Sequence, residues 1–575
     1  MNDISGARPD PSGVAWRALG DDERLELLLE CDAPGELTEP EGVRIGVLGP
    51  ELARRRASRR LARLELRVRG AHIEVHARLD GPLEPAAPRM RIVVETVENV
   101  EMVATVDAAD ARAVCSDPVL AETAHVLVGM PEGEADRRYR VRVEIQDAAT
   151  LVWAPVGIAA SDVFTTTGHQ LRSGRVHRAG RVVAGPHPDQ FVVRPRLGRR
   201  ARTRLRRRAH RASAPGAELL VFPYYPNNPY QRILYSRLGA RFAVTVAEDV
   251  PGLLAHLRAT PDPARPRILH LNWTAPIAQQ ATTGEEAARA AATFLEALDD
   301  FRAGGGHLVW TVHNTMPHEL RHRDAELTVL RGVVERADRV IVMNPATPRL
   351  VADDYALRPE TVVVHPHPNY RGRFRDEVST AQARRALVLA PDATVLLLFG
   401  TLRPYKGLDR LLEAFARARV AHPELVLLVA GEVGSGVDEA ALRRALDVEG
   451  VHAAVRYVPA DDAQFWIRAA DAMVLPYLGA LNPSLVYLAA TFGRPVLLSD
   501  LGALDHLHGE PWVRSADFDD PDALLEALPW IEAARAGETR AEQDRAVAGF
   551  LQRTDPAAVA DAFTDLLEVV AGLPE

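Results

Sequence analysis

The sequence is poor in cysteine and has no long apolar run. Among 575 residues only Cys31 and Cys115 are cysteines, which excludes a disulfide-stapled scaffold, and their spacing does not fit a zinc site. Apolar runs such as Val395–Phe399 have the length of a strand and cannot span a bilayer. Residues 1–30 are mixed and acidic rather than basic and then apolar. We therefore expect a cytoplasmic chain without a secretion signal.

Motifs of several well-known chemistries are also missing. The sequence contains no Gly-x-Ser-x-Gly nucleophile elbow, no phosphate loop of the nucleotide hydrolases and no zinc-ligand spacing. We therefore expect a site with no metal ion and no cofactor.

The length predicts three domains, at roughly 100–200 residues per domain. Apolar residues make up 47% and charged residues 26%, as in ordinary globular proteins. We predict a partly disordered segment over 1–42 with one short helix around Asp21–Glu30. The predicted parts that follow are a β-sandwich-like accessory domain over 43–195, an arginine-rich linker over 196–215, two α/β domains over 216–375 and 376–540, and a C-terminal helix over 541–575.

Residues 43–195 carry the alternating pattern of β-strands. Five such segments are separated by Gly, Pro and Asp clusters, with no long helix pattern between them: Leu64–Val68, His72–Arg78, Arg91–Thr96, Arg140–Ile145 and Gln190–Arg194. The pattern favours a β-sandwich. Such a domain could brace its neighbour, mediate assembly or bind sugar chains, and we favour the first two roles.

Residues 194–211 form a dense positive run, in which ten of eighteen positions are arginine. Like charges repel one another, so the run is typical of a solvated linker. It could also bind the surface of an anionic membrane, where each basic residue adds about 1 kcal/mol. No aromatic residues interleave it and the net charge of the chain is −9, so we do not expect nucleic acid as a partner.

From about residue 216, short apolar runs alternate with amphipathic helices. The first set of predicted strands is Leu219–Phe222, Arg267–Leu271, His307–Val312, Arg339–Met343 and Thr361–His365. The second set is Thr394–Phe399, Leu425–Ala430, Ala453–Val458, Ala472–Leu475 and Pro495–Leu498. Such runs predict two doubly wound α/β domains with buried parallel sheets. Ligands bind at the carboxyl ends of such strands, so the candidate site is the cleft between the domains.

The loop 400–407 is the strongest candidate for phosphate binding. It follows an apolar strand and leads into a helix, whose free N–H groups and positive dipole end favour an anion. Gly400 and Gly407 permit close approach of the backbone, and Arg403 and Lys406 add positive charge. A solvated surface loop is the alternative interpretation.

This segment resembles a known family. Gly-x5-Lys-Gly followed by Leu-x-x-Leu-Leu-x-Ala-Phe is similar to the donor-phosphate loop of GT-B glycosyltransferases, especially the large family 4. The resemblance covers about residues 216–572 and includes Gly431-Glu432 after a strand and Gly493-Arg494-Pro495-Val496. It implies two facing Rossmann-like domains, the first for the acceptor and the second for the donor, with the terminal helix crossing back to the first. It also implies that backbone near Tyr457 and Val458 holds the nucleotide base.

One part of the family pattern is missing. Many retaining members carry Glu-x7-Glu before Gly-x-Pro-Val, but the corresponding positions here are Ala480 and Leu488. The segment 475–484 instead resembles a subgroup of polysaccharide and glycolipid assembly, in which Tyr477, Asn482 and Ser484 would contact phosphate or sugar hydroxyls. The stereochemical course, retaining or inverting, therefore stays open, as does an inactive relative.

The first domain offers titratable groups at the end of the strand His307–Val312. His313 and Glu319 are our candidate catalytic bases, and His318 is a third. Asn314 is a candidate for acceptor binding. The alternative is structural: Asn314 or Thr315 would begin the next helix while His313 bonds a buried carbonyl. Members of the resembled subgroup carry a similar Thr-x-His-Asn segment.

Two further loops point to the same cleft. The segment 223–230 is rich in aromatic and amide side chains, which suit sugars, and we select Tyr225, Asn227 and Asn228 as acceptor-binding residues. Turn formation alone could also explain its prolines and asparagines. Trp273, at the end of another strand, is a candidate acceptor platform or a packing residue.

The resemblance implies a hexosyltransferase that uses a UDP- or GDP-type sugar and a saccharide or glycolipid acceptor. The transfer would be metal-independent, with Arg403, Lys406 and helix dipoles balancing the departing diphosphate. A non-catalytic relative that binds sugar or assembles through the β-rich domain is the alternative. A nucleotide-sugar epimerase of the same fold is a third possibility, for which we find no matching set of acidic residues.

Overall fold

The fold is described from a computed structural model of the chain. The structure describes residues 216–226, 228–262, 265–317 and 319–573. Before them it describes shorter pieces: 49–58, 61–69, 72–79, 90–97, 114–115, 123–129, 137–146, 153–158, 181–184 and 190–194. The predicted helix around Asp21–Glu30 and the arginine run beyond Arg194 lie outside the described residues.

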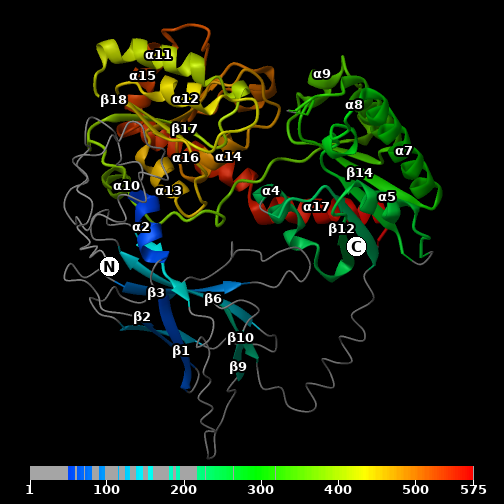
Figure 1. The fold of residues 1–575 in the computed structure, drawn as a ribbon, viewed down its shortest axis with the longest axis horizontal. Helices are drawn as coiled ribbons and strands as arrows, with labels where there is room; N and C mark the ends of the chain where they lie inside the picture. Colours follow the sequence, from blue (N-terminus) through cyan, green and yellow to red (C-terminus); the bar gives the residue numbers. More distant parts are fainter. Residues whose placement is uncertain are drawn as a thin grey trace, which may run out of the picture.

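Two α/β domains lie side by side, each built on a parallel sheet (Figure 1). The first sheet has the order β12-β11-β13-β14-β15-β16. Its strands are β11 (Ala217–Phe222), β12 (Phe242–Val246), β13 (Arg267–Leu271), β14 (Gly306–Val312), β15 (Arg339–Val342) and β16 (Val362–Val364). The strand order reverses at β11, so β11 and β13 flank the switch point at which such sheets bind ligands.

Helices cover both faces of the first sheet. They are α4 (Pro229–Leu234), α5 (Val250–Arg258), α6 (Ala275–Ala278), α7 (Gly284–Ala303), α8 (Arg323–Arg336) and α9 (Thr347–Val351). Phe294, Leu298 and Phe301 of α7 are buried, as expected for the apolar face of an amphipathic helix. This helix begins with a capping box, in which Thr283 and Glu286 each accept the backbone N–H of the other.

The second sheet has the order β19-β18-β17-β20-β21-β22, with its switch point between β17 and β20. Its strands are β17 (Thr394–Phe399), β18 (Leu425–Ala430), β19 (Val451–Ala454), β20 (Ala472–Leu475), β21 (Val496–Ser499) and β22 (Val513–Ala516). Its helices are α10 (Thr380–Ala386), α11 (Leu408–Ala421), α12 (Glu439–Leu446), α13 (Ala463–Ala469), α14 (Ser484–Thr491) and α15 (Ala523–Ala533).

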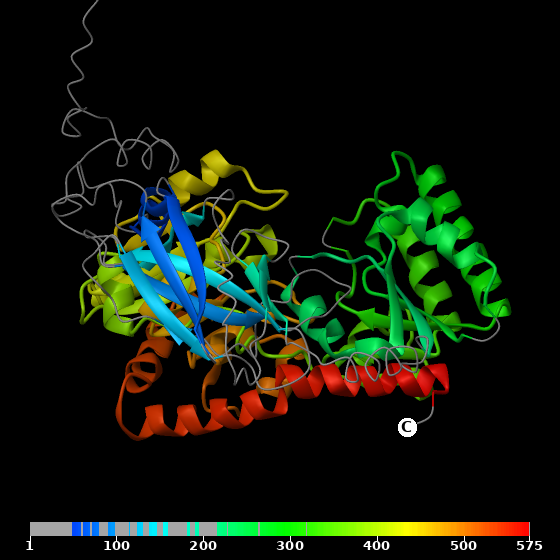
Figure 2. The ribbon, with the colours of Figure 1, turned by 90° about the horizontal axis from the view of Figure 1, so that it is seen from below.

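Two consecutive helices, α16 (Gly537–Arg553) and α17 (Pro556–Ala571), connect the domains. Figure 2 shows α17, in red, extending from the second domain along the first. Phe563 and Leu567 of α17 are buried in one cluster with residues of β11. Asp555 caps the N-terminus of α17, because its Oδ1 accepts the N–H groups of residues 557 and 558 at 3.0 Å each.

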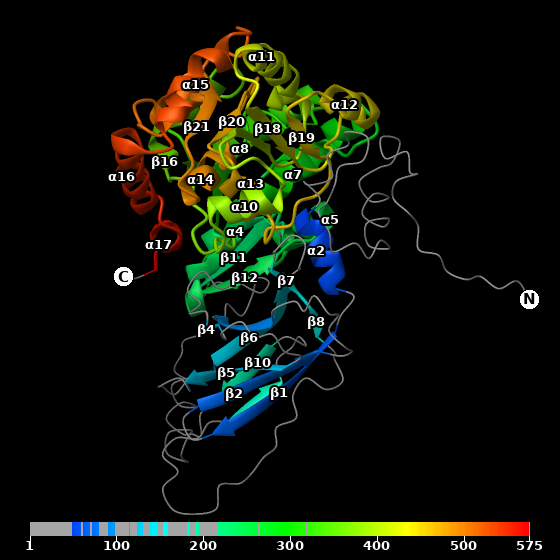
Figure 3. The ribbon, with the colours of Figure 1, turned by 90° about the vertical axis from the view of Figure 1, so that its left-hand side faces the viewer.

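The described N-terminal pieces are mostly strands, which lie below the two domains in Figure 3. They pair in two sheets, with the orders β5-β2-β1-β8 and β4-β3-β6-β10-β9, and β7 pairs with β6. Their bounds are β1 (Leu61–Arg69), β2 (His72–Leu79), β3 (Met90–Val97), β4 (Val114–Cys115), β5 (Thr123–Gly129), β6 (Arg137–Gln146), β7 (Trp153–Pro155), β8 (Gly157–Ile158), β9 (Arg181–Ala184) and β10 (Gln190–Arg194). The sandwich architecture itself stays a prediction.

A buried carboxylate joins these strands to the segment between the two α/β domains. Glu144 of β6 is fully buried. It pairs with Arg91 of β3 at 2.7 Å and with Arg375 at 2.9 Å. The helix α2 (Gly49–Ser58) makes a further contact with the second domain, where Arg54 pairs with Asp462. Removal of one partner from such a buried group is costly, since it leaves an uncompensated charge.

The two predicted parallel sheets are confirmed, but three details of the prediction were wrong. Each sheet has six strands rather than about five, because β12 and β22 were missed. The strand predicted over Ala453–Val458 is β19 (Val451–Ala454). It ends at Ala454 because its partner β18 ends at the paired Ala430. The predicted boundary at residues 540 and 541 falls inside α16.

Candidate active site

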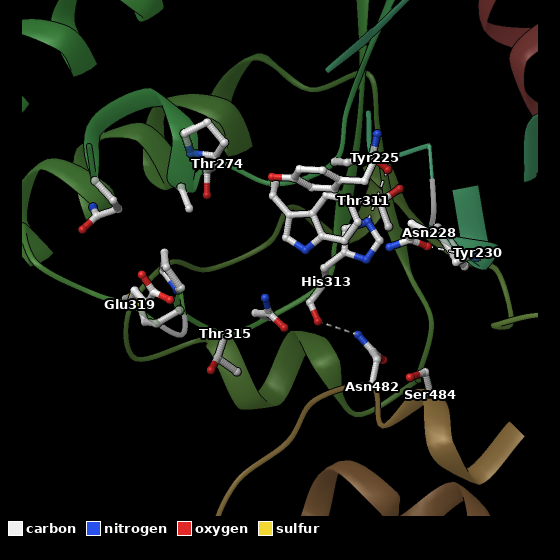
Figure 4. A pocket seen from close by; sticks show the side chains of 18 of the residues that line it. Tyr225, Asn228, Tyr230, Thr274, Thr311, His313, Thr315, Glu319, Asn482 and Ser484 are labelled. Carbon is white, nitrogen blue, oxygen red and sulfur yellow. Dashed lines mark hydrogen bonds between the residues drawn. The ribbon is translucent and has the colours of Figure 1, made fainter. Parts of the chain in front are cut away.

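A cavity of about 800 Å³ lies between the two domains, at the switch points of both sheets. The first domain lines it with loops that follow β11, β13 and β14, and the second domain contributes Arg403, Asn482 and Ser484. Figure 4 shows Asn482 and Ser484 across the cavity from Tyr225, with His313 between them. The structure therefore brings predicted residues of both domains together in one cleft.

His313 and Trp273 form an aromatic wall of the cavity. Their rings are stacked, with centroids 4.0 Å apart and an interplanar angle of 16°. The ring centroids of Tyr225 and Trp273 are 5.2 Å apart. Tyr230 meets His313 edge-on, with ring centroids 5.3 Å apart. Trp273 thus packs and lines the cavity at once, and its role as an acceptor platform stays a prediction.

A chain of hydrogen bonds behind this wall fixes the orientation of His313. Asn272 Nδ2 donates to Tyr235 Oη at 3.0 Å and Asn272 Oδ1 faces His313 Nε2 at 3.3 Å. His313 Nε2–H is therefore the donor, which leaves Nδ1 unprotonated. Tyr235 continues the chain to His270 Nδ1 at 2.7 Å, and His270 Nε2 reaches Thr311 Oγ1 at 2.8 Å.

The histidines of this region are neutral at pH 7. Burial lowers the pKa of His270 to about 3. Burial also lowers the pKa of His313 well below its usual range, and the neighbouring His270 and His367 lower it further. A neutral imidazole can accept a proton, but a lowered pKa makes it a weaker base.

Glu319 lies at the rim of the cavity rather than beside His313. Its side chain is exposed, and it accepts a 2.5 Å hydrogen bond from Ser435 Oγ of the second domain. Figure 4 shows Glu319 on the far side of the cavity from Asn228. Asn314 also lines the cavity. The catalytic roles of His313 and Glu319 stay predictions, and His318 lies outside the described residues.

The predicted residues of the segment 223–230 have different environments. Tyr225 is 46% exposed and lines the cavity. Asn228 also lines it, but its Oδ1 caps α4 by accepting the N–H groups of residues 230 and 231 at 3.0 and 3.3 Å. The structure thus gives Asn228 the role that the alternative interpretation expected, and its contact with an acceptor stays a prediction. Asn227 lies outside the described residues.

The loop after β17 is shaped by glycines. Gly400 and Gly407 have φ angles of +83° and +64°, which favour glycine. A Cβ atom at Gly407 would lie 2.0 Å from the carbonyl oxygen of Pro476, so no other residue fits there without displacement. Gly431 packs on the same turn, since its Cβ would lie 2.2 Å from the Gly400 oxygen.

Lys406 is buried in this loop without an anionic partner among the described residues. It is 5% exposed, and its Nζ donates to the carbonyl oxygen of Phe399 at 2.8 Å. Burial lowers the pKa of Lys406 to about 7, and the charge of Arg403 lowers it further. Arg403 itself lines the cavity, whereas Gly400, Lys406 and Gly431 are not among the residues that line it.

The remaining predicted donor residues are spread around the second sheet. Glu432 is exposed beside Thr401 Oγ1, at 3.4 Å. Tyr457 is 64% exposed and Val458 packs on the core. Tyr477 is buried against Tyr405. These four residues do not line the cavity, and their donor roles stay predictions.

Two asparagines tie the domains together beside the cavity. Asn482 Nδ2 donates to the carbonyl oxygens of Val312 and His313, at 3.2 and 3.1 Å. Asn344 makes the reciprocal contact, donating to the carbonyl oxygens of Leu481 and Ala503 at 3.0 and 2.9 Å. Ser484 begins α14 nearby and lines the cavity.

The sequence did not reveal several polar residues around this cavity. Asn272, Tyr230 and His367 line it, and Glu326 of α8 stands buried in its wall. Burial raises the pKa of the Glu326 carboxyl. The strand end that carries Asn272 and the segment 223–230 that carries Tyr230 gave a signal in the sequence, whereas His367 and Glu326 meet the cavity through tertiary packing.

Relatives of known name match part or most of the chain. The D-inositol 3-phosphate glycosyltransferase of Streptomyces bingchenggensis is 33% identical over 182 residues, or 30% of this chain and 40% of that protein. The same-named protein of Actinosynnema mirum is 33% identical over 225 residues, or 36% of this chain and 53% of that protein. The chain thus spans about half the length of these relatives.

A third relative is matched over a longer stretch. The GDP-mannose:glycolipid 4-beta-D-mannosyltransferase of Xanthomonas campestris pv. campestris is 28% identical over 337 residues, or 57% of this chain and 87% of that protein. Among solved structures, Anabaena HepE in complex with UDP is 16% identical, with 61% of this chain and all of that chain covered and a TM-score of 0.47. Most of the second α/β domain, residues 393–533, matches the family described as Glycosyl transferases group 1.

Proposed function

We propose that the chain is a metal-independent glycosyltransferase of GT-B type. It transfers a hexose from a UDP- or GDP-sugar to a saccharide or glycolipid acceptor. The observation that carries the proposal is the shared cavity, which Arg403 of the glycine-shaped loop and the wall of His313 and Trp273 line together. The family match over residues 393–533 and the names of the three relatives support the same activity.

The donor half of the reaction requires positive charge around a departing diphosphate. Arg403 lines the cavity, Lys406 lies in the same loop, and Ser484 offers a hydroxyl at the start of α14. Preorganised donors of this kind stabilise the charge that develops on the leaving group. A bound diphosphate also supplies the anion that Lys406 lacks, which raises its pKa and restores its charge.

The acceptor half requires a proton acceptor if the configuration inverts. The acceptor hydroxyl oxygen attacks the anomeric carbon and the bond from this carbon to the diphosphate breaks. The hydroxyl proton goes to the base, and the electron pair of the broken bond stays on the diphosphate. His313, through its unprotonated Nδ1, and Glu319 at the rim are the two candidates for this base.

A thermal-shift panel tests the donor site first. UDP-, GDP- and ADP-sugars are compared on the native chain and on Lys406→Ala. A ligand that binds only the folded state raises the free energy of unfolding, by about 2.7 kcal/mol when its concentration is 100 times its Kd, and so raises the melting temperature. We expect a shift with one nucleotide type and its loss in the variant. No shift with any nucleotide would contradict the proposal.

Transfer is then measured with the nucleotide that binds, starting from GDP-mannose and a lipid-linked sugar because the Xanthomonas relative carries these in its name. Binding without turnover on any acceptor would favour the alternative, a non-catalytic relative. The missing Glu-x7-Glu pair, with Ala480 and Leu488 in its place, is the observation behind that alternative.

Contact with a membrane surface is a separate proposal. It rests on the ten arginines of residues 194–211. Among the described residues no helix is long and apolar enough to span a bilayer. We expect flotation with anionic vesicles to depend on salt, and to be lost when these arginines are replaced by glutamine. Unchanged flotation of the variant would contradict the proposal.

A further inference from the structure

Glu326 is a buried acid in the first domain that the proposed chemistry leaves without a role. It lies in the first turns of α8 and is fully buried, in the wall of the cavity. No cation pairs with it among the described residues, and its partners are two neutral side chains. A buried carboxyl group is costly unless its hydrogen bonds are satisfied, so its partners indicate what it does.

The first partner holds the strand end that carries Trp273. Thr274 Oγ1 donates to Glu326 Oε1. Thr274 directly follows Trp273 and precedes the short helix α6, so this bond fixes the backbone from which the indole projects. The stacking of Trp273 on His313 depends on that position.

The second partner holds the loop that carries Glu319. Gln279 Nε2 donates to Glu326 Oε2 at 2.9 Å. The other end of the same amide, Gln279 Oε1, accepts the backbone N–H groups of Arg321 and His322 at 2.8 and 2.9 Å. These bonds fix which way the amide points, because only its NH₂ group can face the carboxylate.

We propose that Glu326 is a positioning residue that sets the distance between the Trp273 wall and the Glu319 loop. One carboxylate bonds both ends of α6, and through Gln279 it reaches the two residues that precede α8. Figure 4 shows Thr274 and Glu319 on the two segments concerned. The acceptor-binding role of these segments rests on the proposed glycosyltransferase function, whereas their connection through Glu326 does not.

Hydrogen exchange tests the connection without any substrate. The readout is the exchange rate of the Arg321 and His322 amides. Glu326→Ala removes the bonds to Thr274 and Gln279. We expect exchange at the Arg321 and His322 amides to become about tenfold faster or more, while the exchange of other first-domain amides is unchanged. Glu326→Gln keeps both bonds, because its oxygen can face Gln279 and its NH₂ group can donate to Thr274 Oγ1, so its exchange stays within about twofold of the native chain.

Milder variants keep the test decisive if Glu326→Ala fails to fold. Thr274→Val removes only the bond to Oε1, and Gln279→Met removes the bond to Oε2 together with the link to the Glu319 loop. We expect Gln279→Met to speed exchange at Arg321 and His322, and Thr274→Val to leave it within about twofold. Unchanged exchange in a folded Glu326→Ala would overturn the proposal, and if that variant does not fold, unchanged exchange in Gln279→Met would overturn it.

Steady-state kinetics separate positioning from proton transfer. We expect Glu326→Ala to lower kcat/KM for the acceptor about tenfold or more while the Kd of the nucleotide stays within about twofold, and Glu326→Gln to restore activity. If Glu326→Gln is as inactive as Glu326→Ala while its amides stay protected, Glu326 acts through its charge or proton and positioning is wrong. An inactive native chain would sink the proposed function, and the exchange result would still decide the positioning role.

Discussion

The two halves of the cavity balance their polar groups in opposite ways. In the first domain His313, Asn272, Tyr235 and His270 bond to one another and are neutral. In the second domain Arg403 and Lys406 form no ion pair among the described residues, and Lys406 has only a carbonyl oxygen as acceptor. The hydrogen bonds of the first half are therefore complete as they stand, whereas the second half lacks a counter-charge, which the diphosphate of the proposed donor would supply. This difference is what we expect if the wall of the first half is rigid and the loop of the second half is completed by a bound ligand.

The largest loss of stability is expected from a change in the shape of the loop 400–407 of the second half. Gly407→Ala places a Cβ 2.0 Å from the Pro476 oxygen at φ +64°. Gly572, with φ +63° and nothing within 4 Å, is a matched control. The left-handed backbone costs each alanine variant about 1–2 kcal/mol, and the clash costs Gly407→Ala about 1–3 kcal/mol more. Urea denaturation measures both, and equal losses would show that the loop yields without strain.

The unbalanced charge of the second half predicts a substitution that stabilises. Lys406→Met removes a buried ammonium group, and we expect the free energy of unfolding to rise by about 2–4 kcal/mol below pH 7 while nucleotide binding is lost. The pKa of Lys406 is about 7 in the folded chain against the usual 10.5. Between these values the unfolded chain holds a proton that the folded chain lacks, so native stability rises with pH.

The difference between the Lys406→Met variant and the native chain should therefore be largest below pH 7 and shrink towards pH 10. Urea denaturation at pH 6, 8 and 9.5 measures this difference. A difference that does not change with pH would mean that Lys406 keeps its charge when the site is empty. Lys406→Arg, which stays charged at every pH used, is the control.

In the first half we expect removal of a polar side chain to lower the free energy of unfolding, whereas Lys406→Met in the second half raises it. Asn272→Ala removes the partner of both Tyr235 and His313, and we expect a loss of about 1–3 kcal/mol, since His313 Nε2–H is left without an acceptor and Tyr235 Oη without a donor. Asn314→Ala is the control, because Asn314 also lines the cavity and has no side-chain hydrogen bond among the described residues. Thermal denaturation of both variants measures the difference. A stabilised Asn272→Ala would remove the contrast between the two halves.

The smallest effect is expected where the two halves touch at the rim. Ser435→Ala removes the hydrogen bond to Glu319, but both side chains are exposed. We expect less than about 1 kcal/mol of stability to be lost, because water replaces the bond. Hydrogen exchange of residues 431–438 reports any local loosening, and a loss as large as that of Asn272→Ala would show that the rim holds the domains together.

Local sequence patterns identified segments of both halves of the cavity, but not the hydrogen bonds that connect the segments of the first half. The glycines and cations of loop 400–407 lie in one short segment of the sequence, so the loop could be recognised from their spacing. The chain from His313 to Tyr235 joins three separate segments and exists only after the sheet has formed. Glu326 gave no signal at all, because an acid in the first turn of a helix is ordinarily an exposed group.

The fold was predicted in the same uneven way. Strands in the middle of each sheet, such as β13 and β17, have continuous apolar runs and were located with their observed bounds. The missed strands β12 and β22 are edge strands, and their half-exposed residues interrupt the apolar run by which strands were identified.

The position of α17 has a consequence for synthesis of the chain. A polypeptide leaves the ribosome in order of its sequence, and domains generally fold as they emerge. Phe563 and Leu567 cover a cluster that includes Leu219 of β11, so one face of the first α/β domain stays uncovered until residues 556–571 have been made. The first of the two α/β domains to be synthesised is therefore the last to be completed, and one apolar face of it stays uncovered during translation of the second.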